Sequence, residues 1–77
     1  MKRVVVLLAD GFEEVEAVTP IDFLRRAGCD VVVAGVTGDM VTGAHGIAVR
    51  SDVSVAECSG QFDAVVVPGG MPGASNV

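Results

Sequence analysis

Three short apolar runs, none alternating between apolar and polar positions, constrain the fold of this chain most. They are Arg3 to Ala9, Asp30 to Gly35 and Ala64 to Val67, and valine dominates all three. A continuous apolar run bounded by Gly, Pro or Asp is typical of a strand covered on both faces, as in a parallel sheet. Since β-branched valine suits such a pleated interior, we expect three parallel strands.

A helix is predicted between the first two runs. Asp10 and Glu13 have the spacing of a capping box at its start, and Gly28 stands where a left-handed cap would end it. Asp22 and Arg26 form an i,i+4 pair with the acid on the favourable side. A strand, a helix and a strand within about thirty residues indicate a right-handed βαβ unit.

Two smaller elements complete the pattern. The stretch from Met40 to Arg50 is predicted to form a hairpin around a Gly-Ala-His-Gly turn, and Ser54 to Cys58 a single helical turn. Apolar strands need helices on both faces, whereas this chain supplies one substantial helix. We therefore expect the α/β class, with residues 1–77 forming the N-terminal portion of a doubly wound, flavodoxin-like parallel sheet sandwiched by helices. The remainder of this single domain is then missing or lies on another chain.

The composition supports this interpretation. Hydrophobic residues make up 51% of the 77 positions, and the mean hydropathy is +0.60. A compact chain of this length buries only about 60% of the surface that its unfolded form exposes. The apolar residues thus have more surface to bury than the chain can hide, which indicates a missing partner.

Charge and cysteine content exclude several classes of function. A net charge of −5, with five basic residues, argues against nucleic acid binding. No apolar run approaches the ~20 residues that span a bilayer, and the run after Met1 to Arg3 is too short for a signal peptide. No glycine-rich dinucleotide fingerprint and no Walker A motif occur, so we expect no cofactor. Two cysteines without disulfide or metal spacing fit a reducing cytoplasm.

Glu16 is the most informative single residue. On a helical wheel it shares the face that should meet the sheet with Phe12, Thr19, Pro20, Phe23 and Ala27. The charged residues on the opposite face are Glu14, Asp22, Arg25 and Arg26. A carboxyl group in an apolar stripe should have a raised pKa and could donate a proton near neutral pH. Alternatively, a kink at Pro20 could rotate Glu16 outward, so that it reaches water.

The glycine pair after the third run is the second candidate site. Pro68 ends the strand, and Gly69 and Gly70 let a ligand approach the backbone closely. Ligands of open α/β sheets bind outside the carboxyl ends of the strands, where two exposed N–H groups would suit an oxyanion. The alternative is a tight turn without further function.

The remaining candidates carry weaker signals. Cys29 borders a predicted buried strand and is interpreted as a small hydrophobic core residue. Cys58 could be a reactive thiol, but no basic residue near it in sequence would lower its pKa. His45 is the only histidine, and without neighbouring ligands it is assigned to a loop rather than to a metal site.

Two motifs carry a resemblance to a known family. The segments LADGFEEVEAV at Leu8 to Val18 and PIDFLRRAG at Pro20 to Gly28, followed by DAVVVPGGMPGA at Asp63 to Ala74, resemble the ThiJ/PfpI superfamily. They are most similar to its branch that contains the Parkinson-disease protein deglycase and its bacterial relatives. The resemblance covers essentially the whole chain.

The resemblance implies roles for two residues. Glu16 matches the family's buried acid, which hydrogen-bonds the catalytic cysteine, and Gly70 matches the glycine whose N–H contributes to the oxyanion hole. The family's nucleophilic cysteine lies well downstream of the Gly-Gly turn, so neither Cys29 nor Cys58 matches it. His45 does not match the family's histidine partner.

The implied function is that of a cysteine-dependent glyoxalase or deglycase-like hydrolase or lyase. Its substrates would be small dicarbonyls such as methylglyoxal, or their adducts with proteins. Two alternatives stay open: a redox-sensing chaperone of the oxidative-stress response, and a fragment without activity of its own. Implied partners are the C-terminal remainder of the same protein and a second copy in a homodimer.

Overall fold

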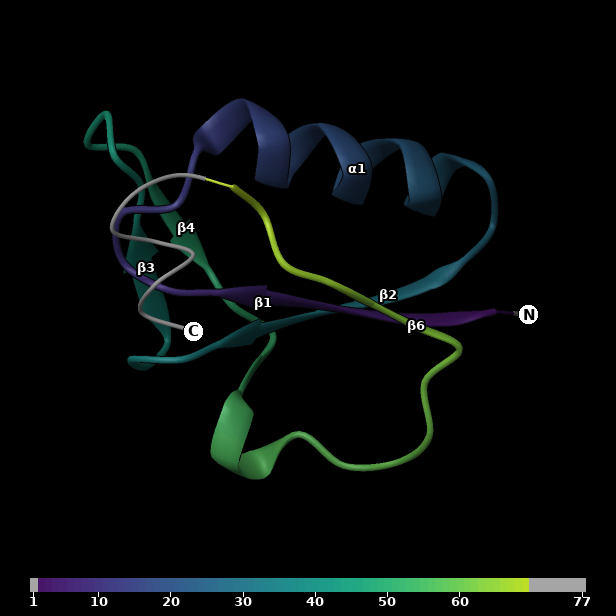
Figure 1. The fold of residues 1–77 in the computed structure, drawn as a ribbon. Coiled ribbons are helices and arrows are strands. Elements are labelled where there is room, and N and C mark those ends of the chain that lie inside the picture. The colour runs from purple at the N-terminus through teal and green to yellow at the C-terminus, as the bar shows by residue number, and fades with distance from the viewer. Residues whose placement is uncertain (1, 70–77) are drawn as a thin grey trace.

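The computed structural model describes residues 2–69, which form a parallel sheet with a helix on one face (Figure 1). The four-stranded sheet has the order β5-β2-β1-β6, and a separate two-stranded hairpin pairs β3 with β4. The elements in chain order are β1 (Arg3–Leu8), α1 (Glu14–Arg26), β2 (Asp30–Gly35), β3 (Met40–Thr42), β4 (Ala48–Arg50), β5 (Val53–Ser54), the 3₁₀ helix η1 (Val55–Glu57) and β6 (Ala64–Val66).

The three apolar runs become adjacent parallel strands, as predicted. β1 pairs with β2 from Arg3 opposite Asp30 to Leu8 opposite Gly35, and with β6 from Val4 opposite Ala64 onward. β5 adds a fourth parallel strand beside β2 that the sequence did not indicate. Two residues are too few to carry a recognisable strand pattern.

The core lies between α1 and the sheet. Its centre is formed by Phe12, Leu8, Val6 and Val41, each less than 2% exposed. η1 and the loop that leads to β6 lie on the opposite side of the sheet (Figure 1). Cover is incomplete at the β6 edge, because Val65 is 61% and Val67 is 47% exposed. The exposed edge at β6 agrees with the expectation that this chain supplies only part of the cover that its apolar strands need.

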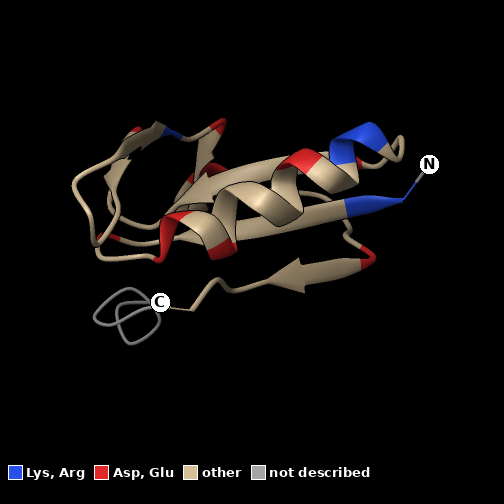
Figure 2. Ribbon diagram, turned by 90° about the horizontal axis from the view of Figure 1, so that it is seen from above, with Lys and Arg blue, Asp and Glu red and all other residues tan. Residues whose placement is uncertain are grey.

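The C-terminal end of α1 is the glycine cap that the sequence predicted. Gly28 has a φ of +90°, its N–H donates to the Arg25 carbonyl, and the Cys29 N–H donates to the Leu24 carbonyl. These two bonds define a Schellman motif. The exposed Asp22–Arg26 ion pair also forms, at 2.8 Å. Figure 2 shows acidic residues in the first turn of α1 and basic residues in its last turn, which complements the helix dipole.

The N-terminal end of α1 differs from the predicted capping box. Glu13 is the N-cap residue and makes no side-chain cap hydrogen bond, while Asp10 accepts a hydrogen bond from the Thr42 N–H instead. The spacing of Asp10 and Glu13 therefore reflects contact with the hairpin rather than helix capping.

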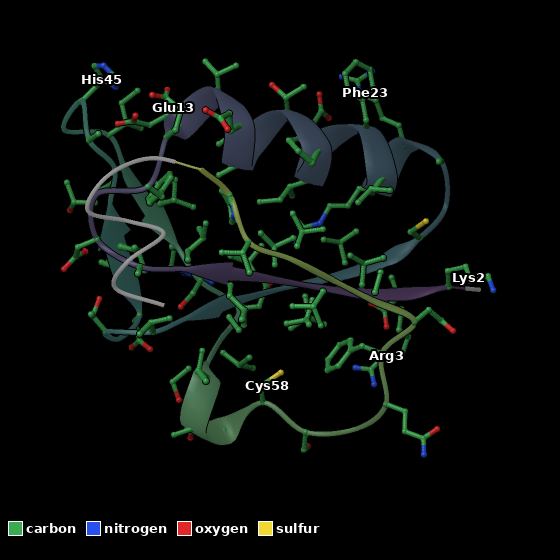
Figure 3. All side chains as sticks on the ribbon, viewed as in Figure 1. Lys2, Arg3, Glu13, Phe23, His45 and Cys58 are labelled. Atoms are coloured by element: carbon green, nitrogen blue, oxygen red, sulfur yellow. The ribbon has the colours of Figure 1, made fainter. Side chains whose placement is uncertain are left out.

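The helix face that meets the sheet was also predicted wrongly. Glu14, Ala17 and Ile21 are the buried positions of α1, whereas Glu16 is exposed and Phe23 is 64% exposed. Figure 3 shows Phe23 pointing away from the sheet. The buried positions follow the i, i+3, i+7 spacing of a helical stripe. The burial that was expected of Glu16 is thus absent in the described part of the chain.

The predicted hairpin and helical turn both form, as β3–β4 and η1. No helix within residues 2–69 is long and apolar enough to cross a membrane.

Candidate active site

The carboxyl ends of β1 and β6, the first turn of α1 and the β3–β4 turn meet at one edge of the sheet (Figure 1). The loop after β1 is bound to the hairpin by backbone hydrogen bonds from the Gly11 N–H to the Thr42 carbonyl and from the Ala44 N–H to the Phe12 carbonyl, both 2.8 Å long. Because the loop and the hairpin hold each other, the start of α1 has a fixed position above this edge.

Glu14 anchors the hairpin turn to the helix. Its Oε2 accepts hydrogen bonds from the His45 N–H at 2.8 Å and from the Ile47 N–H at 3.4 Å, and its Oε1 lies 2.9 Å from the His45 Nδ1. The Glu14 side chain is 8% exposed, whereas the His45 side chain is 70% exposed. Gly43 is required for this arrangement, because a Cβ at that position would collide with the carboxylate.

The contact between Glu14 and His45 shifts the pKa of each residue. Burial raises the pKa of Glu14, but hydrogen bonds from the His45 ring and from the N–H groups of Glu14, His45 and Ile47 outweigh it and lower the pKa to about 2. The hydrogen bond to Glu14, followed by the charges of Glu14 and Glu13, raises the pKa of His45. Glu14 is therefore ionised at neutral pH and acts as an acceptor, not as a proton donor.

Glu13, Glu14 and His45 are the residues in the described part of the chain that come closest to a metal site. One ligand atom from each lies within 4.8 Å of the others, and Figure 3 shows His45 at the tip of the hairpin beside Glu13. A cation would have to replace the hydrogen bond between the His45 ring and Glu14, and Glu14 Oε2 already serves the hairpin backbone. We interpret the group as a structural contact.

Glu16 reaches Gly69, which follows β6. The three atoms nearest to an added Cβ at Gly69 all belong to the Glu16 carboxyl group, with its Cδ at 3.2 Å. The Glu13 N–H donates to the Gly69 carbonyl at 2.9 Å, so the helix start holds the Gly69 backbone in place. Glu16 therefore lies against the backbone at the carboxyl edge of the sheet, where α/β proteins bind ligands.

The other predicted site residues lie elsewhere. Gly70 is outside the described residues. Cys29 packs partly buried against the core and precedes β2 at the amino edge, about 20 Å from the carboxyl edge along a six-residue strand. Cys58 follows η1 on the opposite side of the sheet from α1 (Figure 3).

Sequence reasoning missed the role of Glu14. The signal was present, because Glu14, Ala17, Ile21 and Leu24 follow a heptad-like apolar spacing in which Glu14 is the exception. The lone histidine in the predicted turn was the second clue. Nothing in the sequence connected the two, since 31 residues separate them.

Comparison with known proteins now identifies the family. The family model described as DJ-1/PfpI matches residues 2–77. The chain belongs to the DJ-1/PfpI family. The Parkinson disease protein 7 homolog of Danio rerio is 42% identical over 99% of this chain, and a deglycase of Pyrococcus abyssi is 42% identical over 88% of it. The resemblance that the motifs indicated is therefore confirmed.

Solved structures of this DJ-1/PfpI family confirm the fold. Oxidised DJ-1 of Toxoplasma gondii superposes with a TM-score of 0.91 at 41% identity, over 99% of this chain and 42% of that one. A cysteine-to-alanine mutant of a DJ-1 superfamily protein from Salmonella typhimurium gives 0.94 at 44% identity, over 99% of this chain and 42% of that one. The chain has the flavodoxin-like α/β fold and spans 42% of the length of both curated relatives named above.

Proposed function

We propose that this chain supplies the acid and an oxyanion-binding N–H to a cysteine-dependent active site of the glyoxalase or deglycase type. The substrates are small dicarbonyls such as methylglyoxal, or their adducts with proteins. The observation that carries the proposal is the position of the Glu16 carboxylate, which lies against Gly69 at the ligand-binding edge of the sheet. The name of the Pyrococcus abyssi relative, a deglycase, supports the reaction class.

The two groups have different tasks. Glu16 exchanges a proton with the thiol or with the intermediate that the thiol forms on the carbonyl carbon. The Gly70 N–H donates to the oxygen on which negative charge develops. Glu14 takes no part in this exchange, because its lowered pKa keeps it ionised.

The proposal requires further protein. The nucleophilic cysteine comes from the remainder of a longer protein, which would also cover the exposed Val65 and Val67. We also propose that the protein forms a homodimer, which the exposed Val15 and Val18 of α1 support. We propose a cytoplasmic location, which the two free cysteines support. Native mass spectrometry of the purified sample beside its denatured mass tests both partners.

The reaction is tested in a chimera in which residues 1–77 replace the matching part of the Pyrococcus abyssi deglycase. Wild-type chimera should consume methylglyoxal. Glu16→Gln should lower kcat by about 100-fold or more, the range in which general acid–base catalysis contributes. Asp22→Asn is the matched control, because it removes an exposed carboxylate from the same helix without touching the carboxyl edge.

Equal activity of the Glu16→Gln and Asp22→Asn chimeras would contradict the role of Glu16. A folded wild-type chimera that consumes no methylglyoxal, beside an active parent enzyme, would contradict the proposed reaction. Absence of turnover in the isolated 77-residue chain agrees with the proposal, because Cys29 lies at the amino edge and Cys58 lies on the side of the sheet opposite α1.

A redox-sensing chaperone is the second candidate, favoured by the solved oxidised form of Toxoplasma gondii DJ-1. In that case Glu16 would donate a short hydrogen bond to an oxidised cysteine of the remainder. Suppression of aggregation that depends on oxidation, without turnover of methylglyoxal, would favour the sensor over the enzyme.

A further inference from the structure

The backbone conformation at position 69 does not require glycine. Its φ is not among the positive values of the described glycines, so alanine would fit its conformation. The obstacle is a side chain, because the three heavy atoms nearest to an added Cβ are Glu16 Oε1, Cδ and Oε2, the last two at 3.2 and 3.4 Å. The absence of a side chain at Gly69 therefore creates the space in which the Glu16 carboxylate lies.

The backbone of Gly69 is the fixed partner in this contact. The Glu13 N–H holds the Gly69 carbonyl at 2.9 Å, and the preceding Pro68 is buried. Glu16, by contrast, is an exposed side chain with three rotatable bonds between its backbone and its carboxyl group. A methyl group at Gly69 would therefore move the carboxylate and leave the Gly69 backbone where it is.

We propose that Gly69 is a positioning residue, which holds the Glu16 carboxylate at the carboxyl edge of the sheet by leaving its own side-chain position empty. This inference rests on the proposed function for its effect on catalysis, but the placement of Glu16 is a separate claim. An acid gains its catalytic effect from its position, and a displacement of about 1 Å can cost a factor of about 100 in rate.

A purely structural glycine predicts a different result. If Gly69 only shapes the turn, alanine lowers stability and leaves Glu16 where it is. Gly28 is the control for a glycine that only shapes the backbone, because its φ is +90° and nothing lies within 4 Å of an added Cβ. Gly28→Ala should lower Tm by about 4–8 °C, the shift expected for the strain of a left-handed alanine in a domain of this size.

The first test uses nuclear magnetic resonance on the 77-residue chain. The wild type should show a nuclear Overhauser effect between the Glu16 Hγ and Gly69 Hα protons, and Gly69→Ala should shift the Glu16 side-chain resonances while Tm changes by less than about 2 °C. Gly28→Ala should lower Tm and leave the Glu16 side-chain resonances unchanged. Unchanged Glu16 resonances in Gly69→Ala, or the absence of the Overhauser effect in the wild type, would overturn the proposal.

The second test measures kcat in the chimera with the Pyrococcus abyssi remainder. Gly69→Ala should lower kcat by about 100-fold in the presence of Glu16 and add no loss in a Glu16→Ala background. An equal loss in both backgrounds would show that Gly69 acts independently of Glu16 and would overturn the proposal. If the wild-type chimera is inactive, the proposed reaction fails, and the resonance test still decides the placement of Glu16.

Discussion

Gly43, in the β3–β4 turn, is a position where one added methyl group should destabilise the protein through a single side chain. A Cβ there would collide with the Glu14 carboxylate and lie 2.7 Å from its Cγ. The φ of Gly43 is not among the positive values, so alanine would meet no backbone strain. Any loss of stability in Gly43→Ala must therefore come from the contact with Glu14.

The size of this loss depends on whether Glu14 can move away. Glu14 is 6% exposed, and hydrogen bonds to the His45 N–H and ring hold both carboxylate oxygens. Since neither oxygen can leave without abandoning a donor, the methyl group overpacks the site at a cost of about 1–3 kcal/mol. At about 4–8 °C per kcal/mol, the middle of that range lowers Tm by about 8–16 °C.

Thermal and guanidinium unfolding of four proteins measure this coupling: wild type, Gly43→Ala, Glu14→Ala and the double variant. In the Glu14→Ala background the methyl group finds open space, so Gly43→Ala should cost little there, and the coupling free energy should be about 1–3 kcal/mol. A Gly43→Ala variant within about 0.5 kcal/mol of the wild type, or an equal loss in both backgrounds, would refute the reasoning.

Three further results are expected. Because the pKa of His45 is raised, the stability that His45 contributes is complete below pH 6.5 and is lost as pH rises through the raised pKa. Because the pKa of Glu14 is lowered, the stability that Glu14 contributes is complete above pH 4.5 and is lost as pH falls toward 2. The guanidinium midpoint of the wild type should therefore fall as pH rises above 6.5 through the raised pKa of His45, and it should stay level in His45→Asn. Phe12→Ala, at a side chain 1% exposed, should cost about 3–5 kcal/mol, and cooperative unfolding with a loss below about 1 kcal/mol would contradict the assigned core. Asp22→Asn should cost only about 0.3–0.5 kcal/mol, because both partners of its ion pair are exposed; a larger loss in urea unfolding would indicate a role that the structure does not show.

The sequence predicted the parallel sheet because its signal is local and strong. Each of the three valine-rich runs is apolar at consecutive positions, and no helix period fits them. The Gly28 cap was predictable for the same reason, since a helix that ends in two arginines and a glycine leaves few alternatives. β5 and the N-terminal end of α1 escaped prediction because tertiary contacts with β2 and with the hairpin determine them.

The face of α1 shows where periodicity fails as a guide. Two stripes on this helix carry apolar residues, one through Phe23 and one through Ala17 and Ile21, and the sequence does not say which meets the sheet. The stripe through Phe23 was preferred because it carries fewer charges. The structure buries the other stripe and includes Glu14 in it, because backbone N–H groups of the hairpin turn compensate that charge.

The glutamates in the first turn of α1 thereby have separate tasks. Glu14 faces the hairpin, where N–H donors lower its pKa to about 2, and a carboxylate held ionised to that extent cannot donate a proton near neutral pH. Glu16 faces Gly69 at the edge where ligands of α/β sheets bind. The helical wheel named Glu16 through a wrong argument about burial, whereas the family resemblance named it by position. In the structure, Glu14 bonds to the hairpin, and Glu16 is the carboxylate near it that reaches Gly69.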